Sequence, residues 1–273
     1  MKVVEFEETL DKDIGWRKKE ISDLYLLAQN NNTNEALLKS LILLLYAHWE
    51  GFIKNSSKLY LKYVSDKRIK LKRLETNFHA ILIKNDIKNL TSTANSDSIE
   101  SELKFISSLN KSNKKFKIKI DMDDLKESLV INTEHNLSEK VLRRIFAFTG
   151  LKYKSSLETK KECINSHLLA SRNAIAHGDA IDGTTRRDFS LSLEDINKLK
   201  HIILAIMDSI KEEFSDYASK EFYLINKKLE KERYEQERER LLKEEFKRIE
   251  DAFPKENAFL SLIQLIYNYL QRS

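Results

Sequence analysis

Apolar residues recur every three or four positions along most of the chain, and this spacing predicts a succession of amphipathic α-helices. The first helix is expected over residues 5–29. An asparagine-rich run, residues 30–34, ends it and offers an N-cap for the next helix, expected over residues 35–64. Within that second helix residues 41–47 are all apolar, so every face of it needs to be covered. The pattern therefore places the second helix at the centre of a bundle.

The periodicity weakens between residues 65 and 135. Stretches rich in Ser, Asn and Thr, at residues 89–98 and 107–113, are typical of loops. Residues 116–120 alternate Phe or Ile with Lys, which fits a short strand or an extended segment. We interpret residues 65–135 as an insertion on the bundle.

Helical periodicity returns after the insertion. Asn136 is expected to cap a helix that ends at Gly150, a residue suited to a helix C-cap. The next helix is expected to run from residue 157 to residue 177 and to stop at Gly178. These two helices complete the expected bundle.

The remaining pattern predicts a long last helix. Ser192 and Asp195 resemble a capping box that opens it. Beyond Lys227 the helix becomes almost purely charged, which indicates an exposed helix held by ion pairs between successive turns, or a weak coiled coil. Pro254 is expected to end it, and a final amphipathic helix follows.

Composition points to the same fold class. Five glycines and one proline in 273 residues are far below ordinary usage of roughly 7% and 5%. This scarcity disfavours the turn-rich β and α/β classes, and the chain has no glycine-rich loop to bind a nucleotide phosphate. We expect an all-α protein with two parts. An up-and-down helical bundle over residues 1–215 carries the insertion, and a charged helical extension with a terminal amphipathic helix occupies residues 216–273.

Cysteine content and the apolar runs bear on the compartment. The lone cysteine, Cys163, rules out an intramolecular disulfide and a zinc site built on cysteine pairs. The first thirteen residues are acidic and lack the apolar core of a secretory signal. The longest apolar run, residues 41–47, is far shorter than the roughly 20 residues that span a bilayer. We expect a soluble, cytoplasmic protein without membrane contact.

The net charge of +5 is unevenly distributed. Residues 60–120 contain 14 Lys and Arg against 6 Asp and Glu. A basic segment on a near-neutral body is typical of a nucleic-acid-binding surface, although a solvated lysine-rich surface has the same composition. Phe116 lies among the lysines and could stack on a base. The candidate RNA-binding residues are Lys114, Lys115, Lys117, Lys119, Arg68 and Arg73.

The stretch Ser-Arg-Asn-Ala-Ile-Ala-His-Gly, residues 171–178, is the strongest candidate for chemistry. On a helix, Asn173 and His177 are four residues apart and share a face. Arg172 lies about a third of a turn away, within reach for a long side chain. The small spacers leave the backbone accessible to a substrate or to another helix. The simpler alternative is a pair at a helix end that makes only caps and an ion pair.

This stretch resembles the Arg-x(4–6)-His motif of the HEPN superfamily, including the Asn after the Arg. Two further stretches support the resemblance in the expected order: YAHWEGFIK at residues 46–54 and NLSEKVLRRIFAFTGL at residues 136–151. The similarity is to the stand-alone prokaryotic toxin- and defence-type members, the MAE-like HEPN branch. It covers roughly residues 30–215.

The resemblance implies a metal-independent endoribonuclease on a helical bundle that forms a homodimer, with no cofactor and no metal site. The family's functional residues map onto Arg172, Asn173 and His177, with Glu50 as an addition. Its partners would be an RNA substrate and an antitoxin or another defence protein. Glu50 lies on an otherwise apolar helix, and Arg172 is the expected partner of its carboxylate, for a structural or a positioning role.

Two alternatives to an active ribonuclease remain open. The first is a non-catalytic HEPN module that binds RNA or a partner protein. The second is a bundle that a nucleotidyltransferase antitoxin modifies on a hydroxyl group, such as that of Tyr153 or Thr184.

Overall fold

The computed structural model describes residues 1–92, 99–109, 113–120, 122, 131–133, 136–177 and 191–254. In this part of the chain the regular structure is helical, apart from two isolated β-bridges, which confirms the all-α class. The elements are α1 (Val3–Gln29), α2 (Glu35–Asp66), η1 (Leu71–Arg73), α3 (Thr76–Ser92), α4 (Glu100–Leu109), α5 (Glu139–Thr149), α6 (Ser155–Glu158), η2 (Cys163–Ala170), α7 (Ser171–His177), α8 (Leu193–Ser219), η3 (Ile225–Lys227) and α9 (Lys228–Ala252).

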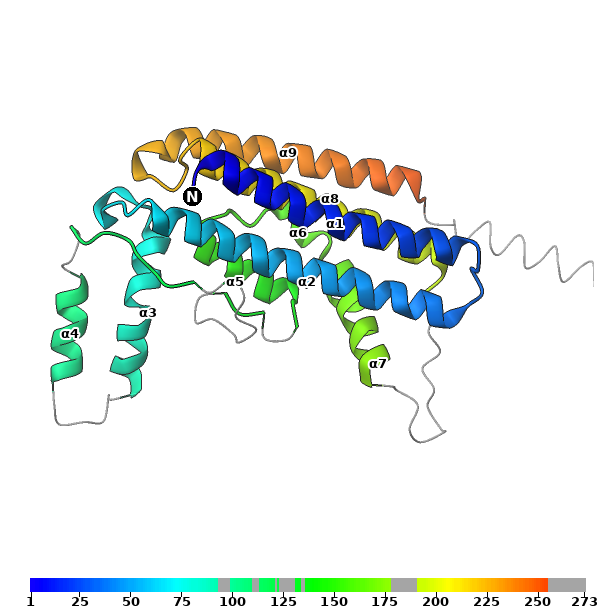
Figure 1. Ribbon diagram of the computed structural model, residues 1–273, viewed down its shortest axis with the longest axis horizontal. Helices are drawn as coiled ribbons and strands as arrows, with labels where there is room; N and C mark the ends of the chain where they lie inside the picture. The colour runs from blue at the N-terminus through cyan, green and yellow to red at the C-terminus, as the bar shows by residue number, and fades with distance from the viewer. Residues whose placement is uncertain are drawn as a thin grey trace, which may run out of the picture.

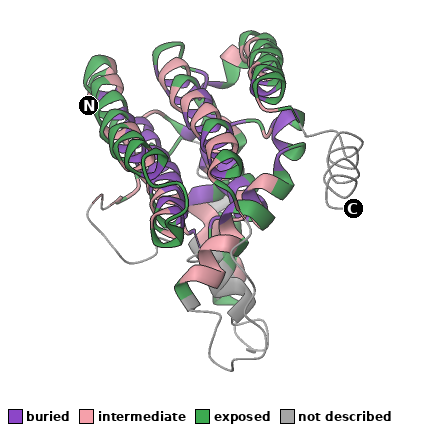
Figure 2. Ribbon diagram, turned by 90° about the vertical axis from the view of Figure 1, so that its right-hand side faces the viewer, coloured by how far each residue is buried: buried purple, intermediate pink, exposed green. Residues whose placement is uncertain are grey.

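The long helices α1, α2 and α8 form the body of the bundle, and α2 lies at its centre (Figure 1). Asn34 caps α2 as expected, because its side chain accepts a hydrogen bond from the Leu37 backbone N–H at 3.3 Å. Helix α2 packs on α1, α8, α5 and α7, and its buried residues face inward (Figure 2). By length and composition alone α2 could cross a membrane, but half of its most apolar window is buried inside the bundle. Burial in the core accounts for that half, but Leu43 and Ala47 are exposed, so the expectation that every face of residues 41–47 is covered is wrong.

The prediction of one long last helix is wrong, because α8 ends at Ser219 and the chain then reverses into α9. Its opening is confirmed: Ser192 and Asp195 form the capping box of α8. Helix α9 then runs back along α8, so that the Tyr217 hydroxyl donates a 2.5 Å hydrogen bond to Glu235. Within the reversal, Phe222 and Tyr223 are each 1% exposed. Their burial stabilises a hairpin that no Gly or Pro marks in the sequence.

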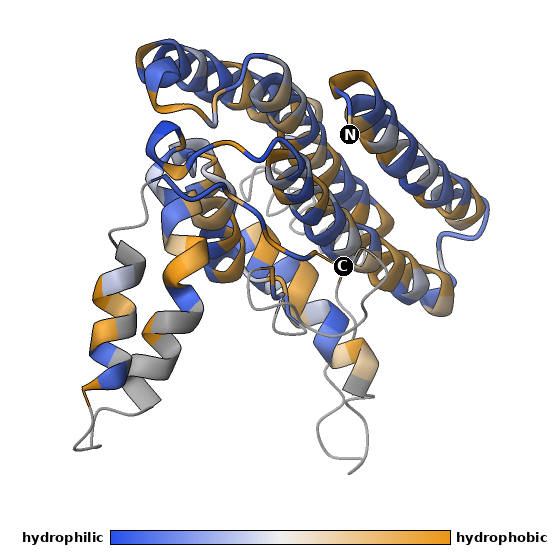
Figure 3. Ribbon diagram, turned by 60° about the vertical axis from the view of Figure 1, so that its left-hand side comes forward, coloured by the Kyte–Doolittle hydropathy of each residue, from blue (hydrophilic) through white to orange (hydrophobic). Residues whose placement is uncertain are grey.

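The insertion contains two helices, α3 and α4, which lie side by side at one end of the molecule (Figures 1 and 3). The prediction of loops at residues 89–98 and 107–113 is therefore partly wrong, because residues 89–92 and 107–109 are helical. The Asn77 side chain donates a 2.8 Å hydrogen bond to the Phe148 carbonyl and fastens α3 to α5. Residues 116–120 form an extended segment and not a strand, which is one of the two alternatives that the sequence pattern allows.

Helix α5 begins later than expected. Its N-cap is Ser138, whose hydroxyl accepts a 3.3 Å hydrogen bond from the Val141 backbone N–H, so the assignment of Asn136 as the cap is wrong. The C-cap is confirmed, because Gly150 adopts the left-handed conformation with φ 78°. The expected final amphipathic helix lies outside the described residues.

Candidate active site

Helix α7 carries the Arg-Asn-His motif and continues directly from η2, which is a π-helix. The single helix expected over residues 157–177 is therefore partly wrong, since Leu157 belongs to the short separate helix α6. Ile164 and Leu168 anchor η2 in the core with no exposed surface. Wider π-helical turns often occur at functional sites. Here the π-helix sets the direction in which α7 presents its side chains.

Three elements meet around the Arg172 side chain: α7, α2 and the segment that leads into α5. The Arg172 Nη1 donates to the Asn173 Oδ1 at 2.7 Å and to the Asn136 Oδ1 at 3.5 Å. Its guanidinium also lies over the Tyr46 ring, 4.8 Å from the ring centroid. Arg172 itself is half-buried. The guanidinium is thus held by two amide oxygens and an aromatic face.

Tyr46 is the buried support of this arrangement, with 2% of its surface exposed. Its hydroxyl accepts a 2.7 Å hydrogen bond from the Leu137 backbone N–H. Burial raises the pKa of Tyr46 to about 12, and Glu50 adds to the rise while the Leu137 N–H and Arg172 oppose it. The phenol therefore stays protonated at neutral pH, and its neutral ring can stack against the cation.

The structure places Glu50 near Tyr46 rather than in contact with Arg172. Glu50 lies one turn after Tyr46 on α2, is half-buried, and interacts with the Tyr46 hydroxyl. The expected pair between Glu50 and Arg172 is wrong, because these two described residues form no ion pair within 4.0 Å. Among the described contacts of the site, Glu50 acts through the tyrosine.

Asn173 and His177 both belong to α7, as expected, four residues apart. The Asn173 carbonyl oxygen is occupied by Arg172, which leaves its NH2 group available to a ligand. The structure describes the backbone of His177 as the last residue of α7, and its side chain is outside the description. Gly178, the expected helix stop, lies outside the described residues.

Sequence reasoning missed two members of the site, Tyr46 and Asn136. A tyrosine four residues before a carboxylate on an otherwise apolar helix was the available signal for Tyr46. Asn136 looked like a helix cap because caps and ligand-holding amides use the same residue types. Its contact with Arg172 depends on the packing of α7 beside the start of α5, which the sequence pattern does not show.

The candidate RNA-binding residues gather at the far end of α2, away from Arg172. An antiparallel bridge between Lys70 and Lys115 joins the two stretches that carry them. The expectation that Phe116 stacks on a base is wrong, because Phe116 has no exposed surface and packs edge-on against Phe78 at 5.1 Å. We call the exposed cations of this surface the basic ridge: Lys67, Arg68, Lys70, Lys72, Arg73, Lys114, Lys115, Lys117 and Lys119.

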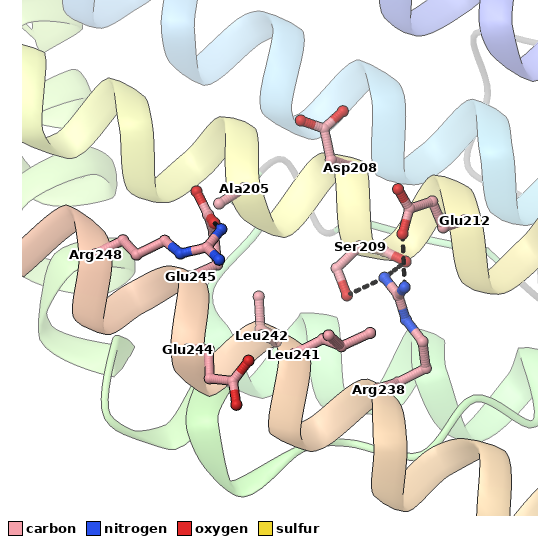
Figure 4. Close-up of a pocket in the computed structure, with 10 residues that line it drawn as sticks. All are labelled: Ala205, Asp208, Ser209, Glu212, Arg238, Leu241, Leu242, Glu244, Glu245 and Arg248. Atoms are coloured by element: carbon pink, nitrogen blue, oxygen red, sulfur yellow. Dashed lines mark hydrogen bonds and ion pairs between the residues drawn. The ribbon is translucent and has the colours of Figure 1, made fainter.

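Cavities also lie away from this site in the described part of the molecule. One of about 740 Å³ lies between η2, the start of α8 and the end of α9. Another, of about 290 Å³, lies between α8 and α9, where Arg238 bonds Glu212 and Ser209 (Figure 4). Arg172 and Asn173 line neither of them. Among the described residues no group of three or more His, Cys, Asp or Glu is placed to hold a metal ion.

Comparison with known families identifies the family of this chain. The model of the HEPN_MAE_28990-like HEPN family matches residues 6–223, more than half of the chain. Comparison with curated proteins and with solved structures finds no match. The matched span includes Tyr46, Glu50 and the whole of α7, and family membership points to a nuclease or RNA-binding role. The chain belongs to the HEPN superfamily, in its MAE-like branch.

Proposed function

We propose that this protein is an endoribonuclease that cleaves cellular RNA without a metal ion. The ribose 2′-OH attacks the adjoining phosphorus, and the P–O5′ bond breaks. The attacking hydroxyl loses its proton to a base, and the leaving 5′-oxygen gains one from an acid. The reaction therefore needs a base, an acid and a group that stabilises the charge of the phosphorane.

The charge of Arg172 is the observation that carries this proposal. Every described contact of its guanidinium is neutral: two amide oxygens and the Tyr46 ring. A carboxylate partner would cancel the positive charge, whereas these groups orient the guanidinium and leave its charge available. A half-buried, oriented and uncompensated arginine suits a phosphate in the transition state.

His177 is proposed to transfer the protons, because an imidazole titrates near cellular pH. One histidine does not easily serve as base and acid in the same step. A homodimer with two-fold symmetry would bring two His177 and two Arg172 to one cleft. Asn173 and Glu50 then act as positioning residues, Asn173 directly on Arg172 and Glu50 through Tyr46.

The proposed setting is toxin–antitoxin or antiphage defence in the cytoplasm, with an antitoxin or defence protein as a partner. This setting follows from the resemblance to stand-alone defence-type HEPN proteins. Such a protein has to be restrained in a healthy cell, so a binding partner that blocks the Arg172 surface is expected.

The direct test is to incubate the purified protein with total cellular RNA in EDTA, beside the His177→Ala variant. Cleavage by the wild type alone, with both proteins equally folded, is the expected result. Cleavage that persists in His177→Ala, or that needs an added divalent cation, would contradict the proposal.

The basic ridge favours a second candidate, a HEPN module that binds RNA without cutting it. Its exposed cations suit an RNA backbone whether or not the Arg172 site is active. Tight RNA binding by a wild-type protein that leaves the RNA intact would favour this candidate. Cleavage that is lost in His177→Ala would exclude it.

A further inference from the structure

Two stretches that are far apart in the chain form one surface at the end of α2. The Leu71 backbone N–H donates to the Lys114 carbonyl at 2.9 Å, and the Phe116 N–H donates to the Ile69 carbonyl at 2.8 Å. These bonds hold residues 113–120 against residues 67–73. The cations of both stretches therefore occupy one continuous face, the basic ridge.

Buried contacts fix the backbone beneath the basic ridge. The Ser65 hydroxyl accepts from the Ile118 N–H at 2.9 Å and lies 3.2 Å from the Ile118 carbonyl, to which it can donate. The His79 ring bonds the Leu71 carbonyl at 2.7 Å, and Phe116 is locked in the core. Because alternate residues of an extended segment point to opposite sides, inward Phe116 and Ile118 turn the lysines between them outward.

The cations of the basic ridge are exposed, and the described residues contain no carboxylate within 4.0 Å of any of them. Neither stretch contains an acidic residue, and the described acidic residues that flank the first stretch are Asp66 and Glu75. Asp66 pairs with the N-terminal amine at 3.6 Å, and Glu75 faces Lys231 at 4.0 Å. The positive charge of the ridge is therefore uncompensated within the described structure.

The chemistry of the ridge fits a phosphate backbone better than a protein or a membrane. No large apolar side chain is exposed in its two stretches, whereas protein interfaces and membrane anchors need an apolar centre. Lys115, Lys117 and Lys119 repeat about 7 Å apart along the extended backbone and so present a row of positive charge to a polyanionic backbone. Such contacts supply affinity without reading sequence.

We propose that the basic ridge is an RNA exosite that anchors a long, folded substrate RNA while another part of it reaches Arg172. This inference rests on the proposed ribonuclease function. Tyr46 lies on α2 and Lys67 is the C-cap of that helix, so the rise per residue puts the two about 30 Å apart. A short oligonucleotide cannot contact both places, so the ridge selects for RNA that spans this distance.

The binding experiment uses full-length His177→Ala protein and a labelled hairpin RNA with a stem longer than 30 Å. The ridge variant is Lys115→Ala/Lys117→Ala/Lys119→Ala. Its matched control, Lys19→Ala/Lys243→Ala/Lys247→Ala, removes the same charge from exposed positions on α1 and α9. The ridge variant is expected to lose about two units of the slope of log affinity against log salt, and the control to lose none.

The cleavage experiment uses the same triple substitutions in the otherwise wild-type protein. The ridge variant is expected to raise KM for the hairpin about tenfold or more with little change in kcat, and to cleave a short oligonucleotide as the wild type does. A merely structural role for these lysines would change both substrates alike.

Several results would overturn the exosite. If the ridge and control variants lose RNA affinity equally, the binding is general charge attraction. If the ridge variant loses no RNA affinity, the RNA binds elsewhere. Binding of polyglutamate as tight as that of RNA would indicate an acidic protein as the partner. If wild-type protein cleaves RNA in any of these cases, the exosite fails and the ribonuclease stands. If the ridge binds RNA but nothing is cleaved, the ribonuclease fails instead.

Discussion

The guanidinium of Arg172 lies 4.8 Å from the centroid of the Tyr46 ring, so a residue of α7 is oriented by a residue of the central helix α2. The tyrosine is itself fixed by the Leu137 N–H at the entrance to α5. The position of the arginine thus depends on the packing of three helices. We expect substitutions at either residue to affect RNA cleavage, but for different physical reasons.

Arg172→Ala is expected to lower the cleavage rate by about 10²-fold or more, because it removes an oriented donor to the transition state. Arg172→Lys should also be impaired, since an ammonium group lacks the planar guanidinium that lies over the Tyr46 ring and can bind a phosphate through two N–H groups. Neither substitution leaves a buried carboxylate unpaired, so the free energy of unfolding should change by less than about 1 kcal/mol. Cleavage rates and denaturant unfolding measure the two effects. Full cleavage activity in Arg172→Lys would contradict this, because a positive charge alone would then be sufficient for cleavage.

Tyr46→Phe keeps the aromatic face but leaves the Leu137 N–H without its acceptor. The expected loss in the free energy of unfolding is about 1–3 kcal/mol. Tyr60→Phe is the matched control, because the buried Tyr60 hydroxyl has no hydrogen-bond partner among the described residues. Its removal should cost close to nothing. Equal losses in the two variants by denaturant unfolding would contradict the described role of the Tyr46 hydroxyl.

Two helical glycines are expected to respond to alanine with opposite signs. A Cβ at Gly51 would lie 2.6 Å from the Arg17 Nη1, and Arg17 is held in place by Asp13 and the His48 carbonyl. Gly51→Ala should therefore destabilise by about 1–3 kcal/mol. Gly15 has open space around it, so Gly15→Ala should stabilise by about 0.5–1 kcal/mol through helix propensity. Thermal unfolding of both variants checks the pair, and stabilisation by Gly51→Ala would refute the clash.

Lys154 and Glu213 form an ion pair in which both side chains are almost fully buried. Glu213→Ala should cost about 3–5 kcal/mol, because it leaves the lysine charge buried without a partner. The double substitution Lys154→Met/Glu213→Leu removes both charges and should cost far less. Denaturant unfolding of the three proteins decides the point. A double variant as unstable as Glu213→Ala would mean that packing, and not the charge, dominates.

His48 is expected to make stability depend on pH. Burial, aided by the charge of Arg17 and opposed by Glu20 and Asp13, lowers the pKa of His48 from 6.5. The unfolded chain therefore binds the proton more tightly, and the free energy of unfolding should fall as pH drops below 6.5. In His48→Gln the part of this decrease in the free energy of unfolding that comes from His48 should disappear. Unfolding curves between neutral and mildly acidic pH measure it, and an unchanged decline in the variant would contradict the assignment.

The sequence was sufficient where the physics is local. Helical spacing predicts α1 and α2 to within two residues, and residue type predicts the caps at Ser192 and Gly150 and a cap of α2 within residues 30–34. The Arg-Asn-His motif was placed on one helix because its spacing is itself a helical signal.

The errors that matter most for the site and the fold concern contacts between distant segments. The reversal between α8 and α9 depends on the burial of apolar side chains against α8. No Gly or Pro in the sequence of the reversal indicates a turn there. Phe116 looked available to a base because its neighbours are lysines, yet it packs on Phe78. Glu50 was paired with Arg172 by charge, whereas Tyr46 contacts both. Periodicity cannot show which side chains of two helices meet.

The chemistry of the RNA ends tests the central claim most directly. Wild-type protein, incubated in EDTA with an RNA that it cleaves, is predicted to leave 2′,3′-cyclic phosphate and 5′-hydroxyl ends, and a 2′-deoxy substitution at the cut nucleotide should prevent cleavage there. Products with 5′-phosphate and 3′-hydroxyl ends, or cleavage of the 2′-deoxy substrate, would contradict attack by the 2′-OH and the role of Arg172 derived from it.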